Sequence, residues 1–328
     1  MPNVHRPRAG SLQFWPRKKA KRIYSRVRSW LGSKIPSLQG FAGYKAGMTH
    51  VVLKDNRPHS LTKGKNIVWP ATVIECPPLK ILSFKFYQNS GPYGSKLISE
   101  VFVSNKLDKS LGKKVNLPKN YDSEIKLKEI NFETIDFVRG LFYTQPRLVG
   151  FARKKPEIFE IDVGGRDPKS QFDYLKNLVG KELRVVDFFK SQRMVDVHAV
   201  TKGKGFQGVV KRMGVTLKSH KSEKGQRRAV LGPEGYGKVK FSAPLAGQLG
   251  YQTRTEYNKE IIALGSNGED VNPSGGFLNY GLIKNDYVLI KGSIPGPSKR
   301  MIRFTEPIRG RVTGSNLELK QIILESKQ

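Results

Sequence analysis

The sequence is poor in the residues that metal-binding, disulfide-stabilised and membrane proteins need. Its 328 residues include one cysteine, Cys76, so no disulfide can form within the chain and cysteine-rich zinc sites are excluded. The five histidines are scattered without metal-ligand spacing. No apolar run approaches the roughly 18 residues of a membrane helix, and the basic N-terminus lacks the apolar core of a signal peptide. We expect a protein of the reducing cytoplasm, with no metal, cofactor or membrane partner.

Acidic residues are scarce as well, and this shortage indicates the class of partner. The chain has 59 lysines and arginines against 27 aspartates and glutamates, which gives a formal charge of +32 and a pI near 10.2. Such an excess goes beyond what solubility requires and indicates a polyanion. The length suggests roughly two domains, and 38% hydrophobic residues suffice for a modest core.

The positive charge is concentrated in two long segments. Twelve lysines and arginines precede the first acidic residue, Asp55, and twelve more lie in 201–255 against only Glu223 and Glu234. Between 122 and 190, thirteen basic residues face twelve acidic ones, as in an ordinary globular domain. Both basic segments also contain aromatic residues: Phe14, Trp15, Tyr24, Trp30, Phe206, Tyr236 and Phe241. Cations that neutralise phosphates and rings that stack on bases favour RNA over a merely solvated charged surface.

Six runs rich in β-branched and aromatic residues predict strands separated by Gly, Pro and Asn turns. They lie at 48–54, 66–75, 193–200, 259–265, 286–292 and 300–308. Short strands in this number predict a small barrel or a sandwich. No internal repeat of fixed period is present.

The piece between these strands has elements of its own. The runs 85–89 and 99–105 look like strands, and apolar residues alternate with acidic ones in 155–165. The runs 133–143 and 167–180 look helical; the second has Asp167 as its N-cap, Pro168 in its first turn and Gly180 as its stop. We infer an α/β module inserted into an all-β host.

One stretch, GPEGYGKV at 232–239, resembles the phosphate loop of a nucleotide hydrolase. Such a loop follows a buried strand, opens a helix and ends in Ser or Thr. Here Val239 has no hydroxyl, the preceding residues are basic, and the following ones run into Pro244 without helical periodicity. We interpret the glycines as allowing a close approach to an RNA backbone, with Lys238 at a phosphate. The run TKGKGFQG at 201–208 is a similarly weak nucleotide match.

Six motifs follow one another over nearly the whole chain. They are FAGYKAGMTH at 41–50, TKGKGFQGVVKRMGV at 201–215, LAGQLG at 245–250, YQTRTEYNKEI at 251–261, GGFLNYG at 275–281 and KGSIPGPSKR at 291–300. In this order they resemble the universal large-subunit ribosomal protein of the L-three family. The segments SLQFWPRKKAKR and DFVRGLFYTQPRL resemble its archaeal and eukaryotic branch, and the short C-terminus favours the archaeal form.

The resemblance implies a mostly β fold with an α/β insertion. Its parts are a six-stranded translation-factor-type β-barrel, an inserted α/β domain, a long extended finger loop and a basic N-terminal extension. The expected boundaries are 1–46 for the extension, 47–78 with 190–201 and 250–310 for the barrel, 79–189 for the inserted domain, 202–249 for the finger and 311–328 for a C-terminal tail.

The resemblance also implies a structural constituent of the large ribosomal subunit in the cytoplasm. Such a protein binds large-subunit rRNA and neighbouring ribosomal proteins, supports early assembly and extends its finger toward the peptidyl-transferase centre. It implies no catalysis, no small-molecule substrate and no homo-oligomer. Two alternatives remain: a basic RNA-binding assembly factor or chaperone that leaves the mature ribosome, and an RNA-directed enzyme, which the lack of a convergent acid/base, nucleophile or metal set disfavours.

RNA-binding residues are expected mainly among the cations of the two basic segments. In the N-terminal segment they are Arg6, Arg8, Arg17, Lys18, Lys19, Lys21, Arg22, Arg26, Arg28 and Lys45. In and beside the finger they are Lys202, Lys204, Phe206, Lys211, Arg212, Lys218, His220, Lys221, Lys224, Arg227, Arg228, Tyr236, Lys238, Lys240, Gln248 and Arg254. By resemblance, the cations of 202–212 clamp phosphates and Gln248 marks the re-entry of the returning arm. At the tip, Glu234 and Gly235 stand where relatives commonly place Trp followed by His or Asn, so either Tyr236 substitutes or the tip differs.

Other conspicuous residues have simpler structural interpretations. We expect His198 to be a packed strand residue rather than a base or ligand, and we expect Trp69 and Phe84 to lie in the core. Trp15 and Trp30 remain open between stacking on bases and packing on the barrel. Nothing in the sequence places Glu234 beside His220 as an acid/base pair.

Overall fold

The computed structural model describes residues 10–103, 108–116, 118, 121–217, 237–310 and 316–326. The chain separates into two compact units: unit 1 contains 1–23 and 200–254, and unit 2 contains 24–199 and 255–328. The described part is mostly β. Its α-helices are α1 Ser123–Lys128, α2 Pro168–Asn177 and α3 Val209–Met213, and its 3-10 turns are η1 Gly91–Tyr93, η2 Leu111–Lys113, η3 Phe132–Thr134, η4 Pro146–Leu148, η5 Val185–Asp187 and η6 Gly268–Val271. The longest of these helices, α2, has 10 residues and is too short to cross a membrane.

The larger sheet of the described chain is a closed ring of strands with one strand attached. Its members are β1 Gly40–Asp55, β2 Asn66–Glu75, β7 Met194–Val200, β10 Thr253–Gly265, β11 Tyr287–Lys291, β12 Met301–Thr305 and β13 Leu317–Ile322. They pair in the order β12-β7-β10-β11-β2-β1-β13, and β12 also pairs with β1. In that closing pair Gly40 lies opposite Thr305 and Tyr44 opposite Met301. Each of the six strands from β12 to β1 in this order therefore pairs with a neighbour on both sides.

The six strand predictions are confirmed in position, but several boundaries differ. Strand β10 begins at Thr253 instead of 259, and β12 ends at Thr305 instead of 308. The first strand begins at Gly40 instead of 48, because residues 40–44 pair with β12. The expected C-terminal tail contains β13, which pairs with β1 from Asp55 back to Val51. The early start of β1 and the additional strand β13 both depend on pairing partners distant in the sequence, which local propensity does not encode.

The smaller sheet of unit 2 has the order β4-β3-β5-β6. Its strands are β3 Leu79–Asn89, β4 Ser95–Phe102, β5 Phe137–Thr144 and β6 Ile158–Asp162. The prediction of a helix over 133–143 is wrong, because most of this run forms β5, which pairs with β3 on one side and β6 on the other. The predicted helix over 167–180 is confirmed as α2, with Pro168 in its first turn and Leu175 fully buried.

One continuous hydrophobic core joins the two sheets of unit 2. Buried residues of the ring, such as Phe41 and Tyr44, belong to the same cluster as Phe86 and Phe142 of the smaller sheet. Phe84 is buried as expected. Trp69 is only half-buried, and the Lys291 ammonium lies 3.2 Å from the centre of its ring. Trp69 also packs against the hydrophobic core, so the expectation of a core residue is confirmed in part, and its ring carries a cation–π contact as well.

The last part of the expected N-terminal extension packs into unit 2. Val27 is buried, and Trp30 packs against the hydrophobic core, which decides in favour of packing for this indole. Arg303 of β12 is buried and donates to the carbonyls of Ser25 and Glu160. Its guanidinium also lies 5.7 Å from the Trp30 ring, and its burial lowers its pKa to about 9. The segment after residue 23 is thus part of the folded body.

Candidate nucleic-acid interface

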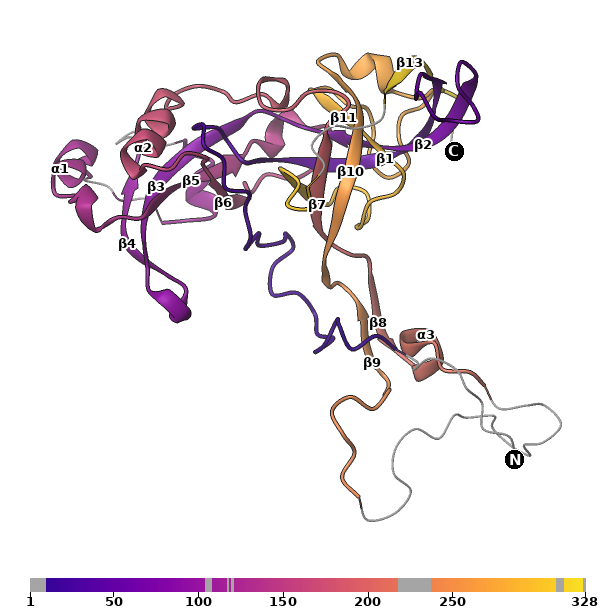
Figure 1. Ribbon diagram of the computed structural model, residues 1–328, viewed down its shortest axis with the longest axis horizontal. Coiled ribbons are helices and arrows are strands. Elements are labelled where there is room, and N and C mark those ends of the chain that lie inside the picture. Colours follow the sequence, from indigo (N-terminus) through magenta and orange to yellow (C-terminus); the bar gives the residue numbers. More distant parts are fainter. Residues whose placement is uncertain are drawn as a thin grey trace. The chain divides into compact units, whose positions relative to one another are not determined.

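Unit 1 is organised by a short two-stranded ladder. Strand β8 Gly203–Gln207 pairs antiparallel with β9 Gly247–Gly250, and α3 lies beside them (Figure 1). The N-terminal arm joins this ladder, since the Ala20 amide donates to the Tyr251 carbonyl at 2.7 Å. Both basic segments of the sequence therefore meet in one unit.

The glycines of the LAGQLG motif have a steric role at this ladder. Gly250 has a φ of +71°, a region that favours glycine, and a Cβ there would collide with the Lys202 carbonyl oxygen. A Cβ on Gly247 would lie 3.2 Å from the Arg212 guanidinium carbon. The motif thus allows β9 to approach both β8 and an arginine from α3.

Arg212 is a structural clamp inside unit 1. Its guanidinium donates to the carbonyls of Leu245 at 2.7 Å, Gln248 at 3.0 Å and Arg17 at 3.3 Å. Arg17 returns a bond of 2.8 Å to the Arg212 carbonyl. Burial, and then the nearby Arg17, lower the pKa of Arg212. Three of its N–H donors are directed at the protein backbone, and the expected phosphate contact stays a prediction.

Three other expected RNA contacts also make hydrogen bonds within the protein. Lys45 is buried and its ammonium donates to the carbonyls of Ile294 and Gly296 at 2.7 and 3.2 Å, so it belongs to the packing of unit 2. The Gln248 amide donates to the carbonyls of Leu249 and Gly250. Arg254 lies 4.4 Å from the Phe14 ring and donates to the Thr253 carbonyl. Burial and Arg17 lower the pKa of Arg254.

The remaining described cations among the expected contacts are exposed. In unit 1 they are Lys18, Lys19, Lys21, Arg22, Lys202, Lys204, Lys211, Lys238 and Lys240, and in unit 2 they are Arg26 and Arg28. The described part of unit 1 contains twelve lysines and arginines and no acidic residue. Internal ion pairs therefore cannot balance its charge, and counter-ions or a polyanion have to do so.

Large apolar side chains stand exposed among these cations. Phe206 is 77% exposed and Phe241 84%, and they are joined by Phe14, Val210, Val239 and Leu245 at 44–54%. Phe241 meets the half-buried Trp15 edge-on at 6.4 Å, so Trp15 has an aromatic partner within unit 1. The exposed Val210, Val239 and Leu245 were not predicted from the sequence, because a single Val or Leu in a basic loop carries no periodic signal. Their exposure indicates a surface made to be covered.

Several expected contacts lie outside the described residues. They are Arg6, Arg8, Lys218, His220, Lys221, Lys224, Arg227, Arg228 and Tyr236, together with Glu234 and Gly235 of the expected tip. Of the stretch that resembles a phosphate loop, residues 237–239 are described, and 237–246 contain a turn and bends but no helix or strand. A nucleotide-binding loop would open a helix at this point, so the following chain lacks the element that such a site needs.

His198 is a packed strand residue, as expected. It is buried in β7, with Nδ1 2.9 Å from the Thr255 hydroxyl and Nε2 3.0 Å from the Thr305 hydroxyl. Burial, and then the charge of Arg303, lower its pKa to about 4. Among the described residues, no group of three or more His, Cys, Asp or Glu side chains is placed to hold a metal ion.

Comparison with known proteins gives the family. The ribosomal protein L3 family model matches residues 1–325. A large ribosomal subunit protein uL3 from Archaeoglobus fulgidus is 48% identical over 309 residues, covering 93% of this chain and 92% of its own. Proteins of the same name from Methanothermobacter thermautotrophicus and Methanoregula boonei are each 43% identical, and the second match covers both chains completely. These relatives are archaeal and the matches span nearly the whole sequence, so the chain belongs to the archaeal branch of the ribosomal protein L3 family.

Proposed function

We propose that this chain is a structural constituent of the large ribosomal subunit and that it binds large-subunit rRNA through unit 1. One observation carries the proposal. The described part of unit 1 combines twelve cations, no acid and exposed aromatic rings. Phosphates would neutralise the cations, and bases would stack on Phe206 and Phe241. The family and the names of its relatives point to the same partner.

The finer architecture follows from the family. The closed ring of six strands supports a translation-factor-type barrel, with the inserted domain over 79–189 built on the smaller sheet. The finger, 202–249, would extend toward the peptidyl-transferase centre, and the protein would take part in early assembly. In this arrangement Arg212 keeps the ladder of unit 1 closed, while Lys202, Lys204 and Lys211 face RNA.

The proposed partners are rRNA and neighbouring large-subunit proteins in the cytoplasm, with one copy of the chain per particle. The role is structural, as the family's is, so the protein would act by binding and by shaping RNA. A basic assembly factor or chaperone that leaves the mature particle is the alternative, because it would need the same cations and aromatic residues.

Sedimentation distinguishes these two roles. The tagged chain is expressed in an archaeal host, and lysates are centrifuged through sucrose gradients at high salt. We expect one copy per mature large subunit after the salt wash. Retention on precursor particles alone would establish the assembly-factor role instead. A variant with Lys18, Lys19, Lys202 and Lys204 replaced by Ala should be lost at lower salt than the wild type, because fewer phosphates are neutralised.

A further inference from the structure

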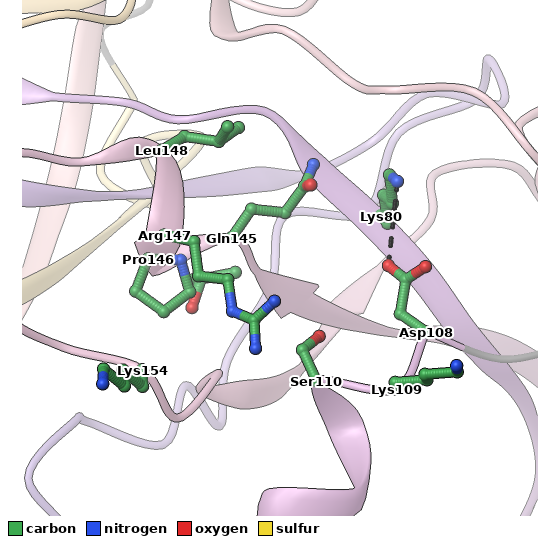
Figure 2. A pocket seen from close by; sticks show the side chains of 10 residues that line it. Lys80, Asp108, Lys109, Ser110, Gln145, Pro146, Arg147, Leu148 and Lys154 are labelled. Atoms are coloured by element: carbon green, nitrogen blue, oxygen red, sulfur yellow. Dashed lines mark ion pairs between the residues drawn. The ribbon is translucent and has the colours of Figure 1, made fainter.

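A basic hollow lies in unit 2, outside the surface described above. Its volume is about 300 Å³. The polar side chains that line it include Lys80, Asp108, Lys109, Ser110, Arg147 and Lys154 (Figure 2). Lys80 comes from β3, Arg147 from η4 and the others from the connections around the smaller sheet. We call this hollow the η4 pocket.

The charges of the η4 pocket do not balance. Its single acid, Asp108, is 3.7 Å from the Lys80 ammonium and accepts a 2.5 Å hydrogen bond from the Tyr143 hydroxyl. Lys80 also pairs with Glu182 at 3.4 Å. Among the described residues, no carboxylate lies within 4 Å of the charged groups of Lys109, Arg147 or Lys154. Three cations at one hollow therefore lack a counter-charge from the described protein.

Buried neighbours fix the turn that carries Arg147. Pro146 is buried at the start of η4. Just before it, the Thr144 hydroxyl accepts bonds from the Tyr44 hydroxyl at 2.9 Å and the Glu157 amide at 3.0 Å. The Gln145 amide donates to the Pro78 carbonyl at 3.2 Å. The backbone of Arg147 is thus positioned before any ligand arrives, which lowers the entropic cost of binding.

The donors of the η4 pocket suit a phosphate group. A guanidinium presents a fork of N–H donors that matches two phosphate oxygens, and an ammonium adds a compact charge. Figure 2 shows the Arg147 guanidinium and the Ser110 hydroxyl at the same hollow, with Lys109 and Lys154 also lining it. Arg147 and Lys154 carry no signal in the sequence, because they lie in the charge-balanced segment 122–190, where only folding separates them from the acids.

We propose that the η4 pocket binds a phosphate group. The group would come from the rRNA backbone, so the pocket would be an RNA contact separate from unit 1. The assignment to rRNA rests on the proposed function. Free phosphate from solution is the other possible source, and the two are separated by experiment.

The first measurement tests the phosphate site without RNA. Lysine acetylation of the full chain is followed by mass spectrometry while inorganic phosphate replaces chloride at constant ionic strength. We expect phosphate to protect Lys109 and Lys154. Arg147→Ala should raise the phosphate concentration for half-protection at least tenfold. Arg166→Ala, which removes an exposed arginine of the same unit outside the pocket, should leave it unchanged. Equal protection of the exposed Lys169 and Lys176 would mean general anion screening and would overturn the proposal.

The second measurement identifies the source of the phosphate. The affinity for large-subunit rRNA is measured against salt for the double variant Arg147→Ala/Lys154→Ala and for the control Arg166→Ala/Lys176→Ala, which loses the same charge. We expect the slope of log K against log salt to shrink by about 0.7 to 0.9 in the pocket variant, the value for one phosphate, and by less in the control. An unchanged slope in the pocket variant would overturn the RNA source. If phosphate protects the pocket but the wild type binds no large-subunit rRNA, the proposed function fails and the phosphate site stands.

Discussion

At the scale of single residues, one buried titratable side chain of unit 2 is hydrogen-bonded to neutral partners. This side chain is His198, and both its ring nitrogens meet threonine hydroxyls, which can each donate or accept. The neutral imidazole is therefore fully hydrogen-bonded. Protonation would place a charge beside the buried Arg303.

This arrangement predicts a loss of stability in acid. The pKa of His198 is about 4 in the folded chain and about 6.5 when unfolded, so between these values the unfolded state binds more protons. Stability should fall as pH drops from 6.5 to 4, and His198 should account for up to about 3 kcal/mol of that fall. We expect the free energies of unfolding of wild type and His198→Gln, measured with urea, to approach each other as the pH falls from 6.5 to 4. Parallel pH profiles would contradict the assignment.

Phe206 provides a test at the RNA surface. Because its side chain is 77% exposed, Phe206→Ala should leave the melting temperature of the free protein unchanged. If a base stacks on the ring, rRNA binding should weaken by about 1–3 kcal/mol, or roughly 5- to 150-fold. Phe206→Trp keeps a flat ring and should retain most of the affinity. Filter binding of the three proteins at fixed salt measures this, and equal affinities for wild type and Phe206→Ala would exclude stacking.

At the scale of elements, local pattern predicted the strands of the ring and failed at β5. Its burial alternates from Phe137 to Leu141, which is a strand period, but then three consecutive residues are buried. The run looked helical because apolar residues also recur at helical spacing. Pairing with β3 and β6 on both sides decides its conformation, and a single sequence does not reveal those partners.

The ladder of unit 1 gives an element-scale prediction. Gly250→Ala would bring a Cβ onto the Lys202 carbonyl and strain a backbone with positive φ, at a cost of about 1–3 kcal/mol. Amide exchange in β9 should accelerate roughly 5- to 150-fold in the variant. Gly208→Ala is the matched control, because no atom lies within 4 Å of the added Cβ. Equal exchange in both variants would show that the close approach at Gly250 does not hold the ladder.

The sequence predicted which segments form the candidate interface, but only part of the residues that face solvent there. Charge alone singled out the two basic segments that unit 1 brings together. It did not distinguish Lys204, which is exposed, from Arg212, whose guanidinium serves three carbonyls. An arginine that donates to backbone and one that faces solvent have the same sequence signature. The difference lies in which carbonyls the folded chain brings within reach.

At the scale of the whole molecule, the structure separates the arm from the folded body. Deleting 1–22 removes seven lysines and arginines of unit 1 and keeps Val27 and Trp30, which pack in unit 2. The slope of log K against log salt for rRNA should fall by up to roughly 5, with the melting temperature of unit 2 unchanged. Deleting 1–34 should lower that melting temperature as well, because packed side chains are lost. An unchanged slope after the shorter deletion would show that the arm does not touch RNA.

The pair that closes the ring has a consequence for the making of the protein. Gly40 pairs with Thr305, 265 positions further along the chain (305 minus 40). During translation at roughly 5–20 residues per second, the start of β1 waits on the order of 10–50 s before its partner β12 is synthesised. Throughout that interval its edge is open to other nascent chains, and a positively charged segment is already outside. A newly made copy therefore exposes an unpaired strand edge and a polycation at the same time until β12 is synthesised.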